Sequence, residues 1–267
     1  MRRLVFRLVL LFGVVLAVAA AASQAERWLI YPFDPRHVSP SEAGLPQVTE
    51  TRITTPDGET LVVWSAPAKH GKPVILYFHG NAGNLATRKG RFQRMLDQGF
   101  GLIAPAYRGS SGSTGAPSED VLIADAVLIA NHPDLPQSKR RVVYGESLGT
   151  AVSIALIAQG TAADALLLEA PLTSIHAMAE THYPALAPLT DKLNNHWPSL
   201  DRAHHLTLPL MIVHGTQDTL IPIEMGRQIH TAAPSGNKSF LAVQGAGHTD
   251  LWRSDTLPKM WRFLSLR

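Results

Sequence analysis

The chain of 267 residues contains no cysteine, which excludes disulfides, thiolate metal sites, a cysteine nucleophile and lipid attachment to cysteine. Charged residues are also sparse, at 17% of the chain, and three of the 24 basic residues lie in the first 25 positions, so 21 basic residues balance 21 acidic ones elsewhere. Nucleic-acid binding requires a clustered excess of Lys and Arg, so we expect no nucleic-acid partner. The nucleotide-binding patterns GxGxxG and GK[ST] are absent as well.

The first 25 residues lack acidic side chains and read as a targeting segment. The basic stretch MRRLVFR precedes a run of 15 apolar residues, 8–22. This length falls between a signal-peptide core and the roughly 20 residues of a membrane-spanning helix. The pattern predicts that residues 1–25 are either a signal peptide or a membrane anchor, and that the body, residues 26–267, is exported or anchored on the non-cytoplasmic side. The terminal position and basic flank disfavour a buried core helix.

The body alternates between strand and helix patterns without repeats or linkers. After an irregular, proline-punctuated lead-in over 26–46, two strands flank the turn Pro56-Asp57-Gly58, which predicts a hairpin. Continuous apolar runs then alternate with helical patterns, which predicts an α/β fold with a mostly parallel sheet and helices on both faces. Further strands are expected at 73–78, 100–106, 140–145, 163–171, 208–215 and 238–245, and helices at 85–98, 119–131 with Ser118 as its cap, after residue 147, and from about residue 254.

The most informative stretch is Gly145-Glu-Ser-Leu-Gly149, between a predicted buried strand and a predicted buried helix. Neither element needs a hydroxyl there for stability. A strand that turns directly into a helix crowds the backbone, and the two glycines relieve that crowding while Ser147 projects above the sheet at a helix N-terminus. We interpret Ser147 as a nucleophile.

A serine nucleophile needs a base that is oriented by an acid, and both should follow later strands. Asp218 follows the strand at 208–215, and His248 lies in the glycine-rich loop after the last strand. The order Ser, Asp, His is typical of this serine turn. We therefore predict a catalytic triad of Ser147, Asp218 and His248, with Glu169 and Asp250 as alternative acids.

Of the other histidines, His79 and His214 each precede a glycine at a strand end, where we expect them to brace the backbone. Catalysis also requires N–H donors directed at the developing oxyanion. We assign these to the backbone of Leu148 and to Asn81 in the loop after the strand at 73–78. The alternative for residues 81–84 is a polar turn that caps the next helix.

The set HGNAGN, AYRGSSGSTGAPSED, YGESLGTAVS, EAP, HGTQDTLIP and GAGHTD resembles the α/β-hydrolase superfamily, in particular small membrane-anchored or exported α/β-hydrolase-domain proteins. The resemblance covers the chain from about residue 28 to the end. It implies the eight-stranded hydrolase fold and a serine hydrolase that acts on esters or thioesters without a metal or organic cofactor. Ser147, Asp218, His248 and Asn81 stand at matching motif positions, whereas no role is assigned to Glu146.

The segment after the sixth strand, about 172–206, is the one insertion long enough for a lid. Its apolar side chains would either line an acyl pocket or form the buried face of two short helices; they are Ile175, Met178, Tyr183, Leu186, Leu189 and Trp197. The loop 108–115 is expected to rim the site. The expected partner is a small-molecule or lipid acyl ester. Alternatives on the same residues are a peptidase or amidase and an acyltransferase, and a non-catalytic binding scaffold is an alternative of another class.

Overall fold

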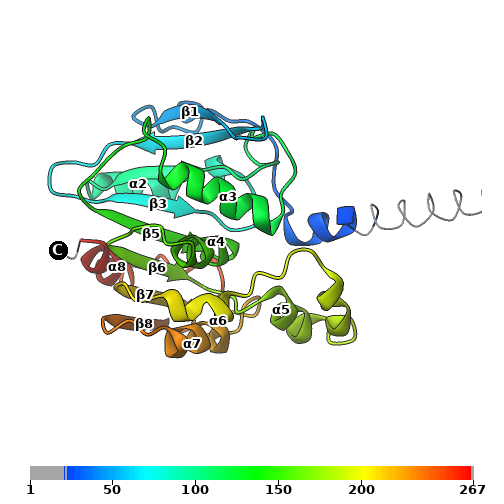
Figure 1. The fold of residues 1–267 in the computed structure, drawn as a ribbon. Coiled ribbons are helices and arrows are strands. Elements are labelled where there is room, and N and C mark those ends of the chain that lie inside the picture. The colour runs from blue at the N-terminus through cyan, green and yellow to red at the C-terminus, as the bar shows by residue number, and fades with distance from the viewer. Residues whose placement is uncertain (1–20, 22, 266–267) are drawn as a thin grey trace, which may run out of the picture.

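A computed structural model describes residue 21 and residues 23–265 (Figure 1). The predicted targeting segment therefore lies almost entirely outside the described residues. Within the described part of the chain, no helix combines the length and the apolar character needed to cross a bilayer.

One eight-stranded sheet forms the centre of the molecule, as the sequence predicts (Figure 1). The strands lie in the order β1-β2-β4-β3-β5-β6-β7-β8, and only β2 runs antiparallel to its neighbours, β1 and β4. The strands are β1 Thr49–Thr54, β2 Thr60–Ala66, β3 Val74–Phe78, β4 Gly101–Pro105, β5 Arg141–Glu146, β6 Ala165–Glu169, β7 Leu210–Gly215 and β8 Lys238–Val243. The predicted Pro-Asp-Gly turn joins β1 to β2, with Gly58 at φ 88°.

Helices cover both faces of this sheet and divide its core into two apolar clusters. Side chains of α3, α4, α6 and α7 pack in one cluster, and those of α2 and α8 pack in the other. The helices are α2 Lys89–Asp97, α3 Glu119–Ala130, α4 Leu148–Ala158, α5 Ile175–His182, α6 Ser199–Arg202, α7 Ile223–Ala232 and α8 Leu257–Leu264, with 3-10 helices η1 Leu85–Arg88, η2 Ala187–Lys192 and η3 Ala203–His205.

The position of β3 in the sheet explains why its sequence is apolar throughout. Val74, Leu76 and Phe78 belong to the first cluster, whereas Ile75 and Tyr77 belong to the second. Successive side chains of a strand point to opposite faces, so a strand covered on both sides has no position for a solvated residue. All five residues of β3 are buried.

Two local expectations were wrong, and one helix, α7, was not predicted. The lead-in, expected to be irregular, begins with a helix, residues 23–30 (hereafter the N-terminal helix). Ser118 occupies the N-cap position of α3, but its side chain makes no capping hydrogen bond. The amide oxygen of Asn195, distant in sequence, accepts the Glu119 N–H at 2.6 Å instead.

Candidate active site

Ser147 lies in the sharp turn between β5 and α4, with φ 52° and ψ −119°. Few non-glycine residues adopt positive φ, and serine turns of α/β hydrolases are strained in this way. A Cβ on Gly145 would approach the Gly149 carbonyl oxygen to 2.5 Å, and one on Gly149 would overlap the carbonyl group of Phe78. The two glycines therefore allow the helix to start against the sheet, and this fixes Ser147 above the end of β5.

The structure brings the three predicted catalytic residues together from the ends of β5, β7 and β8. Nε2 of His248 lies 3.0 Å from Oγ of Ser147, and Nδ1 of His248 lies 2.8 Å from Oδ2 of Asp218. When the Nδ1–H donates to the carboxylate, Nε2 is left to accept the serine proton. The His248 side chain is 18% exposed, and that of Asp218 is 0% exposed.

Backbone contacts hold the acid loop against the histidine loop. The N–H of Gln217 donates to the carbonyl of Ala246 at 2.8 Å, and the N–H of Gly245 donates to Oγ1 of Thr216 at 2.9 Å. Asp250, an alternative acid, accepts the Gly247 N–H at 2.7 Å and pairs with Arg253, so it closes the histidine loop. These bonds set the position of the imidazole before any substrate binds.

The carboxylate of Asp218 is held in its charged form. Burial alone would raise its pKa, but hydrogen bonds from His214, His248 and the Ile221 N–H outweigh burial and hold the pKa well below the usual range. Oδ1 accepts the N–H groups of Leu220 and Ile221 at 2.9 and 2.8 Å, which leaves Oδ2 for the imidazole. The Asp218 carboxylate is therefore charged and bonded to the imidazole of His248.

The two histidines expected to brace the backbone are buried. Nε2 of His214 lies 2.8 Å from the carbonyl oxygen of Ile221, at the far side of the acid loop. Nδ1 of His79 lies 2.7 Å from the Gly80 carbonyl oxygen. Burial, with the nearby positive charge of Arg88, lowers the pKa of His79 to about 3, so this ring is neutral.

The two predicted oxyanion donors both border the space above Ser147. Leu148 is the first residue of α4, where backbone N–H groups have no partner within the helix. The Asn81 side chain is engaged elsewhere, because its Nδ2 donates to the carbonyl of Ile30 at 3.1 Å. This leaves the backbone N–H of Asn81 as the group that could serve the oxyanion. Asn84 caps η1 through a bond from the Thr87 N–H, as the alternative for this loop predicts.

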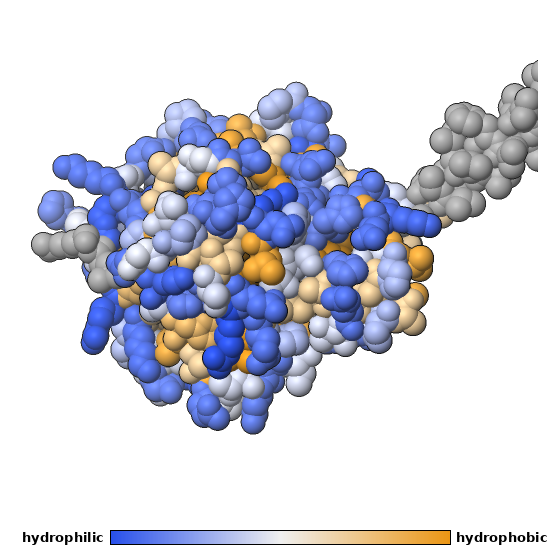
Figure 2. Space-filling model, turned by 60° about the horizontal axis from the view of Figure 1, so that its bottom comes forward, coloured by the Kyte–Doolittle hydropathy of each residue, from blue (hydrophilic) through white to orange (hydrophobic). Residues whose placement is uncertain are grey.

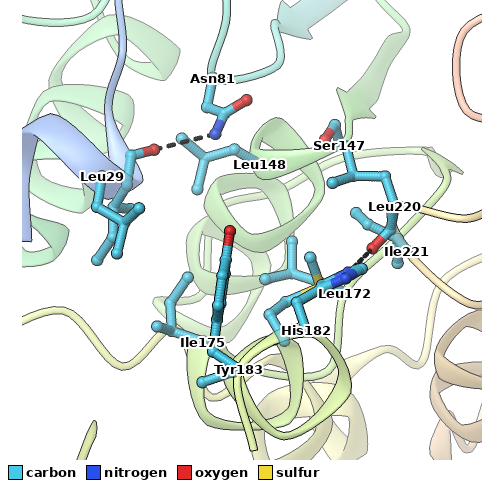
Figure 3. Close-up of a pocket in the computed structure, with 13 residues that line it drawn as sticks. Leu29, Asn81, Ser147, Leu148, Leu172, Ile175, His182, Tyr183, Leu220 and Ile221 are labelled. Carbon is cyan, nitrogen blue, oxygen red and sulfur yellow. Dashed lines mark hydrogen bonds between the residues drawn. The ribbon is translucent and has the colours of Figure 1, made fainter. Parts of the chain in front are cut away.

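A pocket of about 290 Å³ opens above Ser147 (Figure 3). Its walls are mainly apolar side chains from the N-terminal helix, from α4, from the segment after β6 and from the loop after β7. They are Leu29, Ile30, Leu148, Leu172, Ile175, Met178, Ala179, Tyr183, Leu220 and Ile221, with Asn81, Ser147 and His182 as the polar members. Sequence reasoning did not find the contribution of Leu29 and Ile30.

Four of the six apolar side chains predicted in the segment 172–206 take one of the two expected roles, whereas Leu186 and Leu189 take neither. Ile175, Met178 and Tyr183 line the pocket, Leu186 and Leu189 are exposed, and Trp197 is fully buried with its Nε1–H donating to Tyr31 Oη at 2.9 Å. By contrast, none of residues 108–115 is among the side chains that line this pocket in the described part of the chain. Arg108 instead forms ion pairs with Asp57 and Asp125, and these stabilise the hairpin turn.

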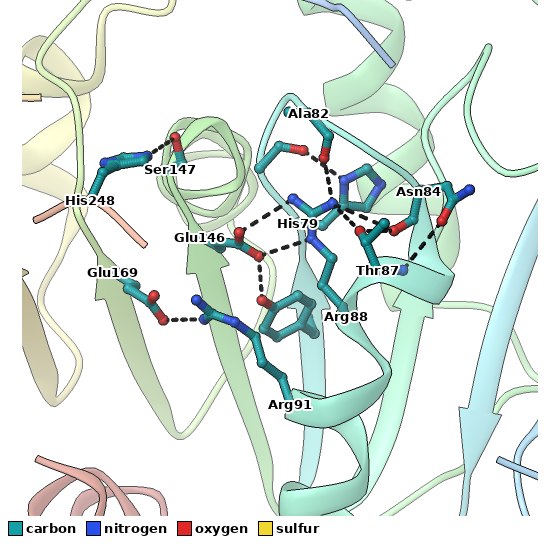
Figure 4. Close-up of polar contacts among 12 residues, drawn as sticks. His79, Ala82, Asn84, Thr87, Arg88, Arg91, Glu146, Ser147, Glu169 and His248 are labelled. Atoms are coloured by element: carbon teal, nitrogen blue, oxygen red, sulfur yellow. Dashed lines mark hydrogen bonds and ion pairs between the residues drawn. The ribbon is translucent and has the colours of Figure 1, made fainter. Parts of the chain in front are cut away.

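Glu146, for which the sequence suggested no role, belongs to a buried polar network beneath Ser147 (Figure 4). Its carboxylate accepts hydrogen bonds from Tyr77 Oη at 2.5 Å and from the Arg88 guanidinium at 3.3 Å. Burial would raise its pKa, but the charges of Arg91 and Arg88 lower the pKa to about 2. Arg88 also donates to the carbonyls of Ala82 and Asn84. The network thus joins the serine turn to the loop that contains Asn81.

Glu169, the second alternative acid, belongs to the adjacent part of this network. It accepts hydrogen bonds from Tyr144 and from Arg91 and Trp252, the last two at 2.6 and 2.9 Å. Its partners are therefore different from those of Asp218. Within the described residues, no group of three or more His, Asp or Glu side chains is placed to hold a metal ion.

A mostly parallel sheet of eight strands, with a strained serine turn after β5 and an acid and a histidine after β7 and β8, defines the α/β-hydrolase fold. A family model described as serine aminopeptidase, S33, matches residues 69–201, which include Ser147. An esterase of Pyrococcus furiosus has the same fold, with a TM-score of 0.68 and 19% identity over 87% of this chain and 96% of that one.

Two sequence relatives extend these similarities. An uncharacterized protein of Mycobacterium tuberculosis is 32% identical over 84% of this chain and 81% of its own length. The lysophosphatidylserine lipase ABHD12 of Rattus norvegicus is 30% identical over 71% of this chain, which spans about half of that lipase (55%). The chain therefore belongs to the α/β-hydrolase superfamily, and it is an enzyme of the serine hydrolase type.

Proposed function

We propose that the protein hydrolyses carboxyl esters, and also acyl thioesters, through an acyl-enzyme on Ser147. His248 takes the Ser147 proton as Oγ attacks the acyl carbonyl, and then gives a proton to the leaving alcohol or thiol. Asp218 orients the imidazole, and the N–H groups of Leu148 and Asn81 bind the oxyanion. His248 next deprotonates a water molecule that attacks the acyl-enzyme, and the acid is released.

The observation that carries this proposal is the chain of hydrogen bonds from Asp218 through His248 to Ser147, which ends beneath a pocket with apolar walls. Such walls suit an acyl chain. The name of the related lipase ABHD12 describes an enzyme that acts on an acyl lipid, which supports a lipid ester as the substrate class. We further propose, from the sequence of residues 1–25, that the hydrolase domain is exported or anchored at a membrane.

The family name serine aminopeptidase raises amide hydrolysis as a second candidate. An aminopeptidase needs a group that recognises a free α-amino cation, and carboxylates commonly do this. No Asp or Glu is among the described side chains that line the pocket. This composition favours ester over aminopeptide substrates.

The test labels the purified protein with a fluorophosphonate probe and then measures p-nitrophenyl esters of increasing acyl length. We expect labelling of the wild type, loss of labelling in Ser147→Ala, and a rise in kcat/KM of about fourfold for each methylene that the pocket buries. A folded wild-type protein that the probe does not label would indicate the binding-scaffold alternative. Labelling without ester turnover would redirect the search to amides, and transfer to an added alcohol would reveal an acyltransferase.

A further inference from the structure

The exposed large apolar side chains of the described residues all come from the three segments that supply most of the pocket wall, which are the N-terminal helix, the segment after β6 and the loop after β7. They are Trp28, Leu29, Tyr183, Leu186, Leu189 and Leu220, which we call the apolar rim. Trp28 and Leu29 are the most exposed, at 73% and 71%. Three of the six, Leu29, Tyr183 and Leu220, also line the pocket. Single exposed apolar residues are ordinary, but a group of them around one opening is typical of an interaction surface.

Specific hydrogen bonds join the three segments that carry the rim. Glu26 of the N-terminal helix accepts the backbone N–H groups of Asn194 and Asn195 at 2.9 and 2.8 Å. Nε2 of His182 lies 2.7 Å from the carbonyl oxygen of Leu220, which joins α5 to the loop after β7 (Figure 3). The rim is therefore one surface whose parts are held in place relative to the pocket.

The composition of the rim matches the interface of a lipid bilayer. Residues 182–190, HYPALAPLT, contain no Asp, Glu, Lys or Arg, and all of them except Ala187 and Thr190 are exposed. Trp28 and Tyr183 add aromatic rings with a polar edge, which are enriched where hydrocarbon meets headgroups. Figure 2 shows apolar residues exposed at the end of the molecule where the described chain begins.

The position of the rim along the chain also favours a bilayer over a protein partner. Trp28 follows the last residue of the apolar run 8–22 by six positions. A sequence with near-membrane-spanning length is therefore directly continuous with the helix that carries Trp28 and Leu29. If the apolar run 8–22 inserted into a bilayer, the apolar rim would lie close to the surface of that bilayer.

We propose that the apolar rim docks onto the surface of a phospholipid bilayer, so that the pocket mouth faces the hydrocarbon. The acyl chain of a membrane lipid then enters the pocket without crossing water, and its ester bond reaches Ser147 near the headgroup level. This inference rests on the proposed esterase function for the turnover of the lipid, but the docking itself is independent of it.

The first experiment measures the depth of Trp28 in the full-length protein. Trp64 and Trp197 are fully buried in the protein, and Trp252 and Trp261 are partly buried, so Trp28 is the tryptophan that a lipid can reach most readily. In vesicles of phosphatidylcholine brominated in the acyl chains, we expect quenching of wild-type tryptophan fluorescence compared with unbrominated vesicles. Trp28→Phe should lose most of that quenching. Equal quenching of both proteins, or no quenching of the wild type, overturns the docking.

The second experiment separates docking from chemistry with Leu186 and Leu189, which are exposed and do not line the pocket. The pair Leu186→Ser/Leu189→Ser should keep wild-type kcat/KM on soluble p-nitrophenyl butyrate. On lysophosphatidylcholine in phosphatidylcholine vesicles, its rate should fall by about tenfold, because two apolar side chains no longer enter the lipid. The matched pair Leu186→Ile/Leu189→Ile should keep the wild-type rate on both substrates.

The outcomes distinguish the two proposals. If the wild type hydrolyses neither substrate and no probe labels it, the esterase function fails, and the bromine quenching alone decides the docking. If the wild type hydrolyses both and the Ser pair matches it on vesicles, the docking fails while the esterase function stands. A concentration-dependent dimer that the Ser pair abolishes, without bromine quenching, would show that a second copy covers the rim and would overturn the proposal.

Discussion

At the scale of single residues, the backbone of Ser147, the proposed nucleophile, stores strain through its positive φ. A residue with a side chain at positive φ costs on the order of 1–3 kcal/mol, and surrounding packing must hold it there. The helix α4 begins directly after this residue, and its N-terminus lies against β3 through Gly149. The serine therefore cannot relax without moving the helix away from the sheet.

This strain predicts that Ser147→Gly is more stable than Ser147→Ala, by about 1 kcal/mol, because glycine adopts positive φ without steric cost. Urea unfolding of the two inactive variants measures the difference directly. Equal stabilities, or a less stable glycine variant, would mean that the larger conformational entropy that glycine loses on folding outweighs the relief of strain at this turn.

The three residues of the proposed triad, which the structure brings together, could be singled out one by one because each belongs to a local pattern. The sequence Gly-x-Ser-x-Gly, the loop with Asp218 and the glycine-rich loop with His248 each follow an apolar strand segment. Glu146 was not predictable in this way, because its partners Arg88 and Tyr77 come from a different helix and strand. A polar network leaves no recognisable pattern in the sequence when its members are far apart along the chain.

At the scale of elements, the strands were predicted better than the helices. Burial on both faces makes each central strand a continuous apolar run, whereas α7 contains Gly226 and follows Pro222 directly, which weakens its helical pattern. The N-terminal helix depends on distant contacts with Asn194 and Asn195. Its sequence, adjacent to prolines, therefore resembled a loop.

These contacts predict that Glu26→Ala changes substrate preference without changing the chemistry. The buried carboxylate accepts two backbone N–H groups, and their loss should lower the free energy of unfolding by about 1–3 kcal/mol. The N-terminal helix would loosen from the segment 172–206, so KM for p-nitrophenyl octanoate should rise several-fold while kcat/KM for the acetate stays unchanged. Glu26→Gln, which keeps one carbonyl acceptor, should be less affected. Equal changes for both esters would contradict this role of the helix.

At the scale of the whole molecule, buried charges make stability depend on pH. The folded pKa of Glu146 is about 2, below its usual 4.5, and Asp218 is shifted in the same direction. A depressed folded pKa stabilises the protein above pH 4.5, and this stabilisation is lost as the pH falls toward 2. For Glu146 alone the difference corresponds to about 3 kcal/mol.

We therefore expect the free energy of unfolding to fall steeply between pH 4.5 and pH 2, with a shallower fall in Glu146→Gln. At pH 7 the variant should be less stable by about 3 kcal/mol, because the buried cation of Arg88 loses its partner. Urea unfolding at a series of pH values measures both effects. If the free energy of unfolding fell with pH equally steeply in both proteins, Glu146 would not be the group that makes stability depend on pH.

Leu29 and Ile30 form part of the pocket wall. Different parts of the sequence would therefore supply the reacting side chains and the side chains that select the substrate. Bond cleavage would depend on side chains after residue 146, while the size of the group admitted would depend partly on a short helix near the beginning. Substitutions or fusions next to that helix would then retune which substrates fit and leave the proton transfers untouched. Variation in such a helix offers a route by which related proteins can diversify without rebuilding their reactive centre.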